Sequence, residues 1–388
     1  MSYLMKTYPP ASFEPARGSG PYLFNSDGEC YIDLISGVGV NGLGHAHPEL
    51  VAAISDQASQ MIHCSNLYTI TLQEQLAEKL VRLAGASRAF FCNSGCEANE
   101  AAIKIARRYA YTRGIHNPKI IVANGSFHGR TLATMAATSN PKVSEGFGKL
   151  IDDFYFVPYD DVDAISDASN LLGGEVVAVM LEPIQGEGGV HVPSSGYLSR
   201  VRELCDQRGW LLIFDEVQCG IARTGRWFAH QHSQIAPDVM TLAKGLGSGV
   251  PIGACVAWGK ASEIFSPGTH GSTFGGNPLA SRCGIATLDI IQKENLMTKA
   301  TNLGNQMRSH LLNSLTGTSC VKRVSGLGLM LGIELDRPCS ELVDQALDLK
   351  LLINVTNQNV IRLLPPLVIT DEVALNSLDK IIKLIKSF

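Results

Sequence analysis

The feature that most constrains this chain is a series of short apolar runs, each followed directly by a cluster of glycine and polar residues. The runs are rich in β-branched or aromatic residues, which is typical of buried β-strands. Five runs and the motifs after them are 88–92 before NSG, 119–123 before NGSFHGRT, 175–181 before EPIQGEGG, 210–214 before DEVQ and 239–243 before KGLG. The pattern predicts a buried sheet with polar groups gathered where its strands end.

Helical spacing appears between several of these strands. Residues 96–111 place alanine, isoleucine and arginine at helical intervals, and residues 198–208 also indicate a helix. Strands that alternate with helices indicate an α/β fold with a mainly parallel central sheet. Ligands bind at the carboxyl ends of the strands in such sheets. We therefore expect the polar motifs to meet at one edge of the sheet.

The texture of the sequence changes after about residue 279. The remainder predicts a helix over 283–313, a strand over 328–335, a helix over 340–350, a strand over 360–364 and a last helix over 371–386. We interpret this part as a smaller α/β domain. The predicted units are an N-terminal segment 1–37 that packs with the small domain, a large cofactor-binding domain 38–279, and a small C-terminal domain 280–388.

Composition narrows the classes of function. A chain of 388 residues, 45% hydrophobic and 18% charged, suits a large globular domain plus a smaller one. The net charge of −4 gives no basic footprint, so we expect no nucleic-acid partner. No apolar run is long enough to span a bilayer, and the first ten residues lack the pattern of a secretory signal.

The ten cysteines are scattered along the chain. Only Cys92 and Cys96 lie close together, and their spacing is not one that zinc or redox sites use. We expect reduced thiols, a cytoplasmic protein and no metal site. His45 and His47 alternate before Pro48, but two histidines without further ligands make a poor metal site, so a turn is the favoured interpretation.

Lys244 and Asp215 are the candidate catalytic residues. Lys244 follows the run 239–243, and burial at a strand end lowers the pKa of an amine and favours Schiff-base chemistry. Taken alone, an ordinary exposed lysine is the commoner explanation. Asp215 follows the run 210–214, and a buried carboxylate needs a partner such as a protonated pyridine nitrogen. A capping or salt-bridged aspartate is the alternative.

Two further motifs suit a phosphorylated aromatic ligand. Residues 93–96 lie between a strand and a long helix, and a helix N-terminus after small residues is an anion site. The alternative is an ordinary helix start in which Ser94 caps the helix and Glu97 completes a capping box. Phe127 follows another strand and could stack on a ring, although a core phenylalanine is the more common explanation of an isolated case.

The ordered motifs resemble those of class III aminotransferases that depend on pyridoxal 5′-phosphate (PLP). The resemblance covers nearly the whole chain. Its motifs are SGVGVNGLGHAHP (36–48), CSNLY (64–68), FFCNSGCEANEAAIKIAR (90–107), GSFHGRT (125–131), EPIQGEGGV (182–190), LLIFDEVQCG (211–220), TLAKGLGSGVPIGA (241–254), HGSTFGGNP (270–278), GLGLMLGIEL (326–335) and NVIRLLPPL (359–367). The resemblance implies the PLP-dependent transferase fold of type I, with PLP as cofactor. Ala222 departs from the family pattern, which usually has glycine there.

The resemblance also implies residue roles. Lys244 would carry PLP as a Schiff base and move the substrate proton, and Asp215 would pair with the pyridine nitrogen. The remaining cofactor contacts would come from Gly95, Cys96, Phe127, Glu216, Val217, Gln218 and Thr273. Thr273 and Ser272 would reach the neighbouring subunit, which implies a two-fold homodimer with shared active sites.

Two arginines and one glutamate are the candidate substrate-binding residues. A planar guanidinium binds a carboxylate through two parallel hydrogen bonds. By resemblance, Arg362 grips the α-carboxylate of glutamate, Arg130 holds a distal carboxylate, and Ser272 contributes at the subunit boundary. Glu187 would pair with Arg362 while an amine donor without a proximal carboxylate is bound. The alternatives are surface salt bridges for the arginines and a solvated loop carboxylate for Glu187.

The substrates implied by the resemblance are an amine donor and 2-oxoglutarate. The expected donor is N-acetylornithine, whose δ-amino group moves to 2-oxoglutarate in arginine biosynthesis. N-succinylornithine, ornithine, 4-aminobutyrate and N-succinyl-diaminopimelate remain alternatives. An aminomutase of the same fold would not need 2-oxoglutarate. A non-enzymatic α/β binding protein would show no cofactor absorbance.

Overall fold

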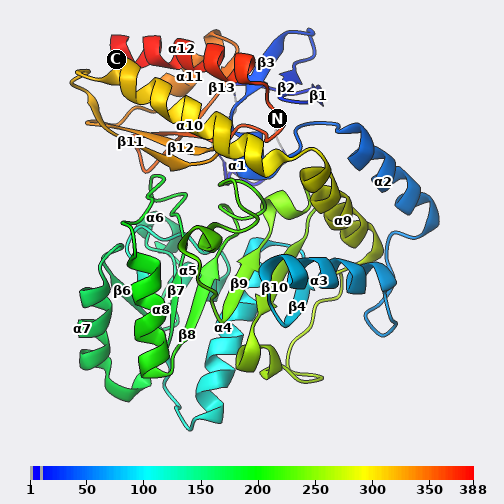
Figure 1. The fold of residues 1–388 in the computed structure, drawn as a ribbon, viewed down its shortest axis with the longest axis vertical. Helices are drawn as coiled ribbons and strands as arrows, with labels where there is room; N and C mark the ends of the chain where they lie inside the picture. The colour runs from blue at the N-terminus through cyan, green and yellow to red at the C-terminus, as the bar shows by residue number, and fades with distance from the viewer. Residues whose placement is uncertain (1–2, 9–11) are drawn as a thin grey trace.

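The computed structural model describes residues 3–8 and 12–388. Residues 1–2 and 9–11 lie outside the described part. The first ten residues, in which we expect no secretory signal, are therefore described only in part. The described residues form two parts, drawn one above the other in Figure 1. The larger part surrounds a seven-stranded sheet, and the smaller part contains two four-stranded sheets.

The seven-stranded sheet is mainly parallel. In spatial order its strands are β4 (Arg88–Cys92), β10 (Gly253–Ala257), β9 (Val239–Leu242), β8 (Leu211–Asp215), β7 (Val176–Leu181), β5 (Lys119–Ala123) and β6 (Phe154–Val157). Only β10 runs against its neighbours. The α/β fold is confirmed, and the five strands predicted for this sheet occur within one residue of their expected ends. Strands β6 and β10 are not among the predictions.

Helices cover both faces of this sheet (Figure 1). Helix α4 (Gly95–Thr112) packs on one face against Ile120 and Val122. Helices α7 (Val162–Leu172) and α8 (Tyr197–Arg208) pack on the other face against Ile121. Because successive residues of a strand point to opposite faces, burial of both faces requires uninterrupted apolar runs. The other helices of this part are α1 (Ser36–Gly39), α2 (Pro48–Gln60), α3 (Thr71–Ala84), α5 (Leu132–Ala136) and α6 (Pro141–Ser144).

The smaller part combines the C-terminal region with the first strands of the chain. One sheet has the order β11 (Val321–Leu327), β12 (Met330–Leu335), β15 (Val360–Leu363) and β14 (Asn354–Thr356). The other has β1 (Arg17–Ser19), β2 (Tyr22–Phe24), β3 (Cys30–Asp33) and β13 (Leu351–Leu352). Strands β3 and β13 pair in parallel, which joins the N-terminal segment to the C-terminal region. Helices α10 (Leu296–Leu315), α11 (Glu341–Asp348) and α12 (Asp371–Ser387) complete this part.

The prediction of one helix over 283–313 is wrong. The structure has two helices, α9 (Pro278–Lys293) and α10 (Leu296–Leu315). Asn295 between them has φ +53°, and a right-handed helix cannot continue through a left-handed residue. The predicted strand over 328–335 begins at Met330, because Gly328 (φ +56°) lies in the turn after the unpredicted strand β11.

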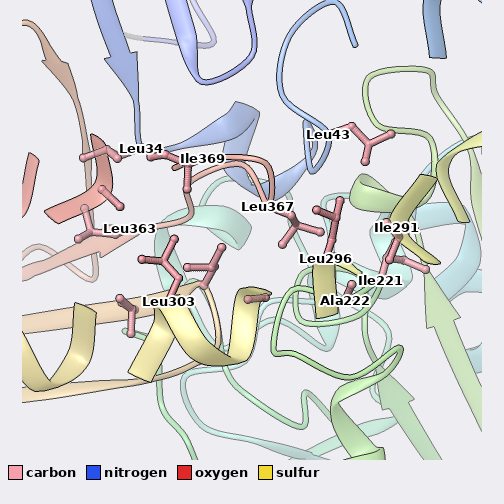
Figure 2. Close-up of a cluster of buried hydrophobic side chains, with 14 of the residues drawn as sticks. Leu34, Leu43, Ile221, Ala222, Ile291, Leu296, Leu303, Leu363, Leu367 and Ile369 are labelled. Atoms are coloured by element: carbon pink, nitrogen blue, oxygen red, sulfur yellow. The ribbon is translucent and has the colours of Figure 1, made fainter. Parts of the chain in front are cut away.

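One apolar cluster joins the two parts and holds the loop that follows β8. Figure 2 shows Ile221 and Ala222 of this loop near Leu296 of α10 and Leu367, which follows β15. All four side chains are buried, and full burial of such an aliphatic side chain stabilises a fold by about 1.5–3 kcal/mol. The loop that carries Asp215 and Gln218 at its start is therefore anchored by the smaller part. Among the helices within residues 3–8 and 12–388, none has the length and apolar character of a membrane span.

Candidate active site

A cavity of about 360 Å³ lies where the carboxyl ends of the central strands meet. This volume lies within the range of roughly 300–1,000 Å³ typical of small-molecule sites. Residues that follow β4, β5, β7, β8 and β9 line it. The lining consists of Val40, Asn93, Ser94, Gly95, Cys96, Phe127, Gly129, Glu182, Glu187, Asp215, Val217, Gln218, Ala243, Lys244, Gly249, Val250, Pro251 and Ile252.

Most of the predicted site residues lie around this cavity. Its lining includes the predicted residues Gly95, Cys96, Phe127, Glu187, Asp215, Val217, Gln218 and Lys244. The predicted residues outside the lining are Arg130, Glu216, Ser272, Thr273 and Arg362. The edge of the parallel sheet therefore brings the main motifs together, as the strand pattern predicts.

Lys244 lies two residues after the end of β9 and begins a short 3₁₀ turn, Lys244–Leu246. Its backbone has φ +40°, a strained conformation for a residue with a side chain. Burial lowers the pKa of the Lys244 amine, while the nearby Glu187 carboxylate acts in the opposite direction. A lowered pKa increases the fraction of neutral amine, which is the nucleophilic form.

Asp215 ends β8 and is 4% exposed. Its Oδ1 accepts a hydrogen bond from the Val217 amide at 3.0 Å. Its Oδ2 accepts from Asn99 Nδ2 and His128 Nδ1, both at 2.8 Å. Donors on both oxygens stabilise the ionised carboxylate in a buried setting. Neither Asn99 nor His128 is among the predicted site residues, although a polar residue on the buried face of α4 was an available signal.

Glu182 is a second buried carboxylate. It belongs to the motif EPIQGEGGV but is not among the predicted site residues. It follows β7, and its Oε1 and Oε2 accept hydrogen bonds from the amides of Phe127 and Gly186 at 2.9 and 3.0 Å. Burial raises the pKa of Glu182, whereas the nearby His128 lowers it. By fixing two loop amides, Glu182 positions both the Phe127 ring and the loop that carries Glu187.

The first residues of α4 also line the cavity. Ser94 caps the helix by accepting from the Glu97 amide at 3.2 Å, and Glu97 accepts from the Asn93 amide at 2.9 Å. A Cβ at Gly95 would come within 2.7 Å of Val217 Cγ1, so glycine permits the close approach of helix and loop. The capped helix start is compatible with an anion site, because Gly95 and Cys96 in the first turn of α4 line the cavity.

Arg362 is 2% exposed and contacts Glu187 and Gln218, which line the cavity, without lining it itself. Its Nη1 donates to Glu187 Oε1 at 2.5 Å and to Gln218 Oε1 at 3.2 Å. The expected pair of Glu187 and Arg362 is thus formed. Burial raises the pKa of Glu187, but the charge and hydrogen bond of Arg362, together with Lys244 and Gln218, lower it further than burial raises it, so the net shift is downward. The pair keeps a buried guanidinium neutralised at the cavity wall.

The remaining predicted residues lie elsewhere. The carboxylate of Glu216 is buried away from the cavity lining and accepts from the amides of Ala229 and His230, so the structure does not bring it to the site. Arg130 is exposed and lies outside the lining. Ser272 accepts from Asn93 Nδ2 at 3.2 Å within the same subunit, and Thr273 is exposed.

No cluster that could hold a metal ion occurs within residues 3–8 and 12–388. His45 instead contacts Asp33 at 2.8 Å, and His47 contacts Glu294 at 3.2 Å. The cavity does fit PLP. It offers a buried amine, a buried carboxylate, a helix N-terminus for a phosphate and an aromatic side chain, from Lys244, Asp215, Gly95 and Phe127 respectively.

Comparison with known proteins agrees with this geometry. The family model described as "Aminotransferase class-III" matches residues 3–385. Acetylornithine aminotransferase of Nitrosomonas europaea is 54% identical over 95% of this chain and 93% of its own length. The enzyme of that name from Methanocaldococcus jannaschii is 45% identical, again over 95% and 93%.

Two solved structures extend the comparison to the fold. Ornithine aminotransferase from Toxoplasma gondii has a TM-score of 0.95 at 35% identity and covers 99% of this chain and 93% of its own. Acetylornithine aminotransferase from Elizabethkingia anophelis has a TM-score of 0.88 at 35% identity, with 100% and 97% covered. Together with the family match, these likenesses establish that the chain belongs to the class III aminotransferases, which are PLP-dependent enzymes.

Proposed function

We propose that this enzyme transfers the δ-amino group of N-acetylornithine to 2-oxoglutarate, giving N-acetylglutamate 5-semialdehyde and glutamate. The observation that carries the proposal is the ion pair of Glu187 and Arg362 at the cavity wall. The relatives named acetylornithine aminotransferase, which are 45–54% identical to this chain, support the choice of donor. The donor N-acetylornithine places the proposed activity in arginine biosynthesis.

The proposed chemistry divides between the cofactor and the chain. PLP, when bound, supplies the electron sink that makes the proton next to the reacting nitrogen removable. Lys244 is the group that holds the cofactor and, once released, moves that proton. Asp215 would pair with the ring nitrogen of the cofactor, and Asn99 and His128 position its carboxylate. Gly95 and Cys96 would hold the phosphate, and Phe127 and Val217 would contact the ring.

The Glu187–Arg362 pair explains how one site accepts two unlike substrates in turn. The δ-amine end of N-acetylornithine has no carboxylate beside it, so Glu187 stays on Arg362 and leaves no unpaired buried cation. Glutamate brings an α-carboxylate to the same place. This carboxylate replaces Glu187 and forms a charge-assisted contact with Arg362. Arg130 is proposed to hold the distal carboxylate of the substrates.

We further propose a homodimer in which Ser272 and Thr273 of one subunit complete the site of the other. Exposed apolar side chains gather near this segment: Phe274 is 58% exposed, Leu67 87% and Tyr68 70%. Asn66 Nδ2 donates to the carbonyls of Ser272 and Gly275, which joins these two segments. An apolar patch of this kind favours a subunit interface.

The unpaired state of all ten cysteines supports our proposal of a cytoplasmic location.

The test is a coupled assay of glutamate formation by the purified enzyme. N-acetylornithine, N-succinylornithine, ornithine, 4-aminobutyrate and N-succinyl-diaminopimelate are each supplied with 2-oxoglutarate. We expect the highest kcat/KM with N-acetylornithine and no turnover when 2-oxoglutarate is omitted. A higher kcat/KM with ornithine or 4-aminobutyrate would overturn the choice of donor, and repeated consumption of the amine without the oxo acid would indicate an aminomutase.

A further inference from the structure

Strand β14 contacts both partners of the Glu187–Arg362 ion pair. Asn354 lies directly opposite Arg362 in the β14–β15 register. Asn354 Oδ1 accepts from Arg362 Nε at 3.0 Å and from Nη2 at 2.7 Å. Thr356, two residues further along β14, donates from Oγ1 to the backbone carbonyl of Glu187 at 2.6 Å. The strand thus holds the arginine by its side chain and the glutamate by its backbone.

The contacts divide the guanidinium of Arg362 into two parts. The edge formed by Nε and Nη2 is bound by Asn354, whereas Nη1 binds Glu187 and Gln218. A guanidinium is planar, so one occupied edge fixes the direction in which the rest of the group points. The acceptor on that edge is a neutral amide oxygen. It therefore orients Arg362 without cancelling its charge.

Neutrality at residue 354 matters because Arg362 must change its anionic partner. A carboxylate at this place would form a permanent ion pair with Arg362 and would reduce the attraction for an incoming substrate carboxylate. The exchange of Glu187 for substrate requires a guanidinium that remains available to an anion on its Nη1 side. Within the described chain, Glu187 is the single carboxylate hydrogen-bonded to Arg362.

We propose that Asn354 is a positioning and specificity-determining residue, which aims Arg362 at the α-carboxylate of glutamate or 2-oxoglutarate while leaving its charge uncancelled. The inference rests on the proposed exchange between Glu187 and the substrate carboxylate. It concerns the dicarboxylate half-reaction only. The half-reaction of the δ-amine donor, in which Arg362 stays masked, does not need an uncancelled charge.

The test compares Asn354→Asp with Asn354→Ala in the PLP-loaded enzyme. Asn354→Asp keeps the size and the acceptor oxygen but adds a charge. We expect it to raise the KM for 2-oxoglutarate by about 10- to 100-fold, the effect of losing one charge-assisted contact. The KM for the amine donor should stay within about threefold. Asn354→Ala keeps the charge of Arg362 but frees its orientation, and we expect a rise of about three- to tenfold for 2-oxoglutarate alone.

A matched control and a binding measurement accompany these assays. Asn357→Asp makes the same chemical change at an exposed residue of the same hairpin, and both KM values should remain at the wild-type level. Calorimetric titration with glutarate, a dicarboxylate that cannot react, reports Arg362 binding without turnover and should be weakened by Asn354→Asp. Equal rises in both KM values, or an unchanged glutarate affinity, would overturn the inference.

The outcome separates this inference from the proposed function. If the wild-type enzyme prefers another ω-amine to N-acetylornithine, the choice of donor fails, and the Asn354 variants are then assayed with the preferred amine. If the donor is right but Asn354→Asp leaves the KM for 2-oxoglutarate unchanged, the inference fails alone. Thermal unfolding of each variant verifies that the loss is not one of folding.

Discussion

Three carboxylates and one amine lie around the cavity, and their surroundings give them different tasks. Asp215 accepts hydrogen bonds on both oxygens, two of them from side chains, whereas Glu182 is buried against two backbone amides. Burial raises the pKa of Glu187, but the pairing with Arg362 contributes to a net lowering. Burial lowers the pKa of Lys244. At the scale of residues, environment decides which group holds a charge and which moves a proton.

Lys244 is predicted to be indispensable. Lys244→Ala should lower kcat by at least about 10³-fold, because the variant loses both the attachment point of the cofactor and the proton-transfer group. The measurement is glutamate formation under saturating substrates. Lys322→Ala, a change at an exposed lysine, is the control and should retain wild-type turnover. Undiminished activity of the Lys244 variant would remove the basis of the site.

Glu187 is predicted to govern discrimination between the two substrates. Glu187→Ala leaves Arg362 without its partner, so kcat/KM for N-acetylornithine should fall about 10- to 100-fold. The value for glutamate should not fall, because glutamate brings its own carboxylate. Both half-reactions are followed by rapid-mixing absorbance, with Glu203→Ala on the exposed side of α8 as control. An unchanged ratio of the two kcat/KM values would rule out the switch.

Glu182 should make stability depend on pH. Burial raises its pKa from 4.5 to about 7 in the folded protein. The folded state therefore binds this proton more tightly, so the group's contribution is fully present below about pH 4.5 and is lost as the pH rises through about 7. We expect wild-type protein to lose more stability between about pH 5 and about pH 8 than Glu182→Gln does. The measurement is the denaturant midpoint of the protein without cofactor, and parallel pH profiles would contradict the assignment.

At the scale of elements, left-handed backbone decides where helices and loops turn. Asn295 separates α9 from α10 with φ +53°, and Ala222 has φ +66° in the loop anchored by the apolar cluster. The family usually has glycine at residue 222, which adopts this conformation freely. The buried methyl group of Ala222 contributes apolar contact in return (Figure 2). Local strain is thus offset by packing between the two parts.

The break at Asn295 can be tested by substitution. Asn295→Val should destabilise the protein by about 1–2 kcal/mol, because a β-branched residue in left-handed conformation clashes with its own backbone. Asn295→Gly should leave stability nearly unchanged, since glycine adopts this conformation without a clash. Urea unfolding gives the comparison, with Asn302→Val within α10 as the control for helix propensity. Equal losses for both valine variants would show that the break carries no special strain.

At the scale of the whole molecule, the two parts hold one site between them. Strands β8 and β9 supply Asp215 and Lys244, whereas β15 of the smaller part supplies Arg362. The apolar cluster at the junction fixes the distance between these groups. The division into units 1–37, 38–279 and 280–388 stays a prediction. A substitution in this apolar cluster is expected to alter substrate binding although the substituted residue does not line the cavity.

The proposed subunit sharing predicts complementation. Lys244→Ala removes the amine of one site, and Thr273→Asp places a repelling charge beside the phosphate of the partner's site. Each homodimer should be nearly inactive. Dimers mixed by co-expression should recover about a quarter of wild-type activity, because half of the dimers are hybrids and each hybrid has one intact site. An active Thr273→Asp homodimer, or no recovery on mixing, would refute the shared site.

The central strands and the motifs at their ends were predictable because burial on both faces leaves uninterrupted apolar runs in the sequence. Lys244, Asp215 and Gly95 each directly follow such a run or begin the next helix, so local sequence marked them as candidates, and the family resemblance gave them their roles. Strands β6 and β10 were not predictable in this way. The first is only partly buried, and the second is fully buried but consists largely of glycine and alanine, which are depleted in strands.

The partners of the predicted residues depended on the tertiary structure. Asn99 and His128 reach Asp215 from a helix and a loop far away in the sequence. Asn354 contacts Arg362 because of the register of two short strands, and no local pattern specifies that register. By itself the sequence determined the strands and the chemical groups at their ends, since both follow from short stretches of residues. Only the packed chain decided which groups meet, because a hydrogen bond between distant segments depends on the distances and directions that packing sets.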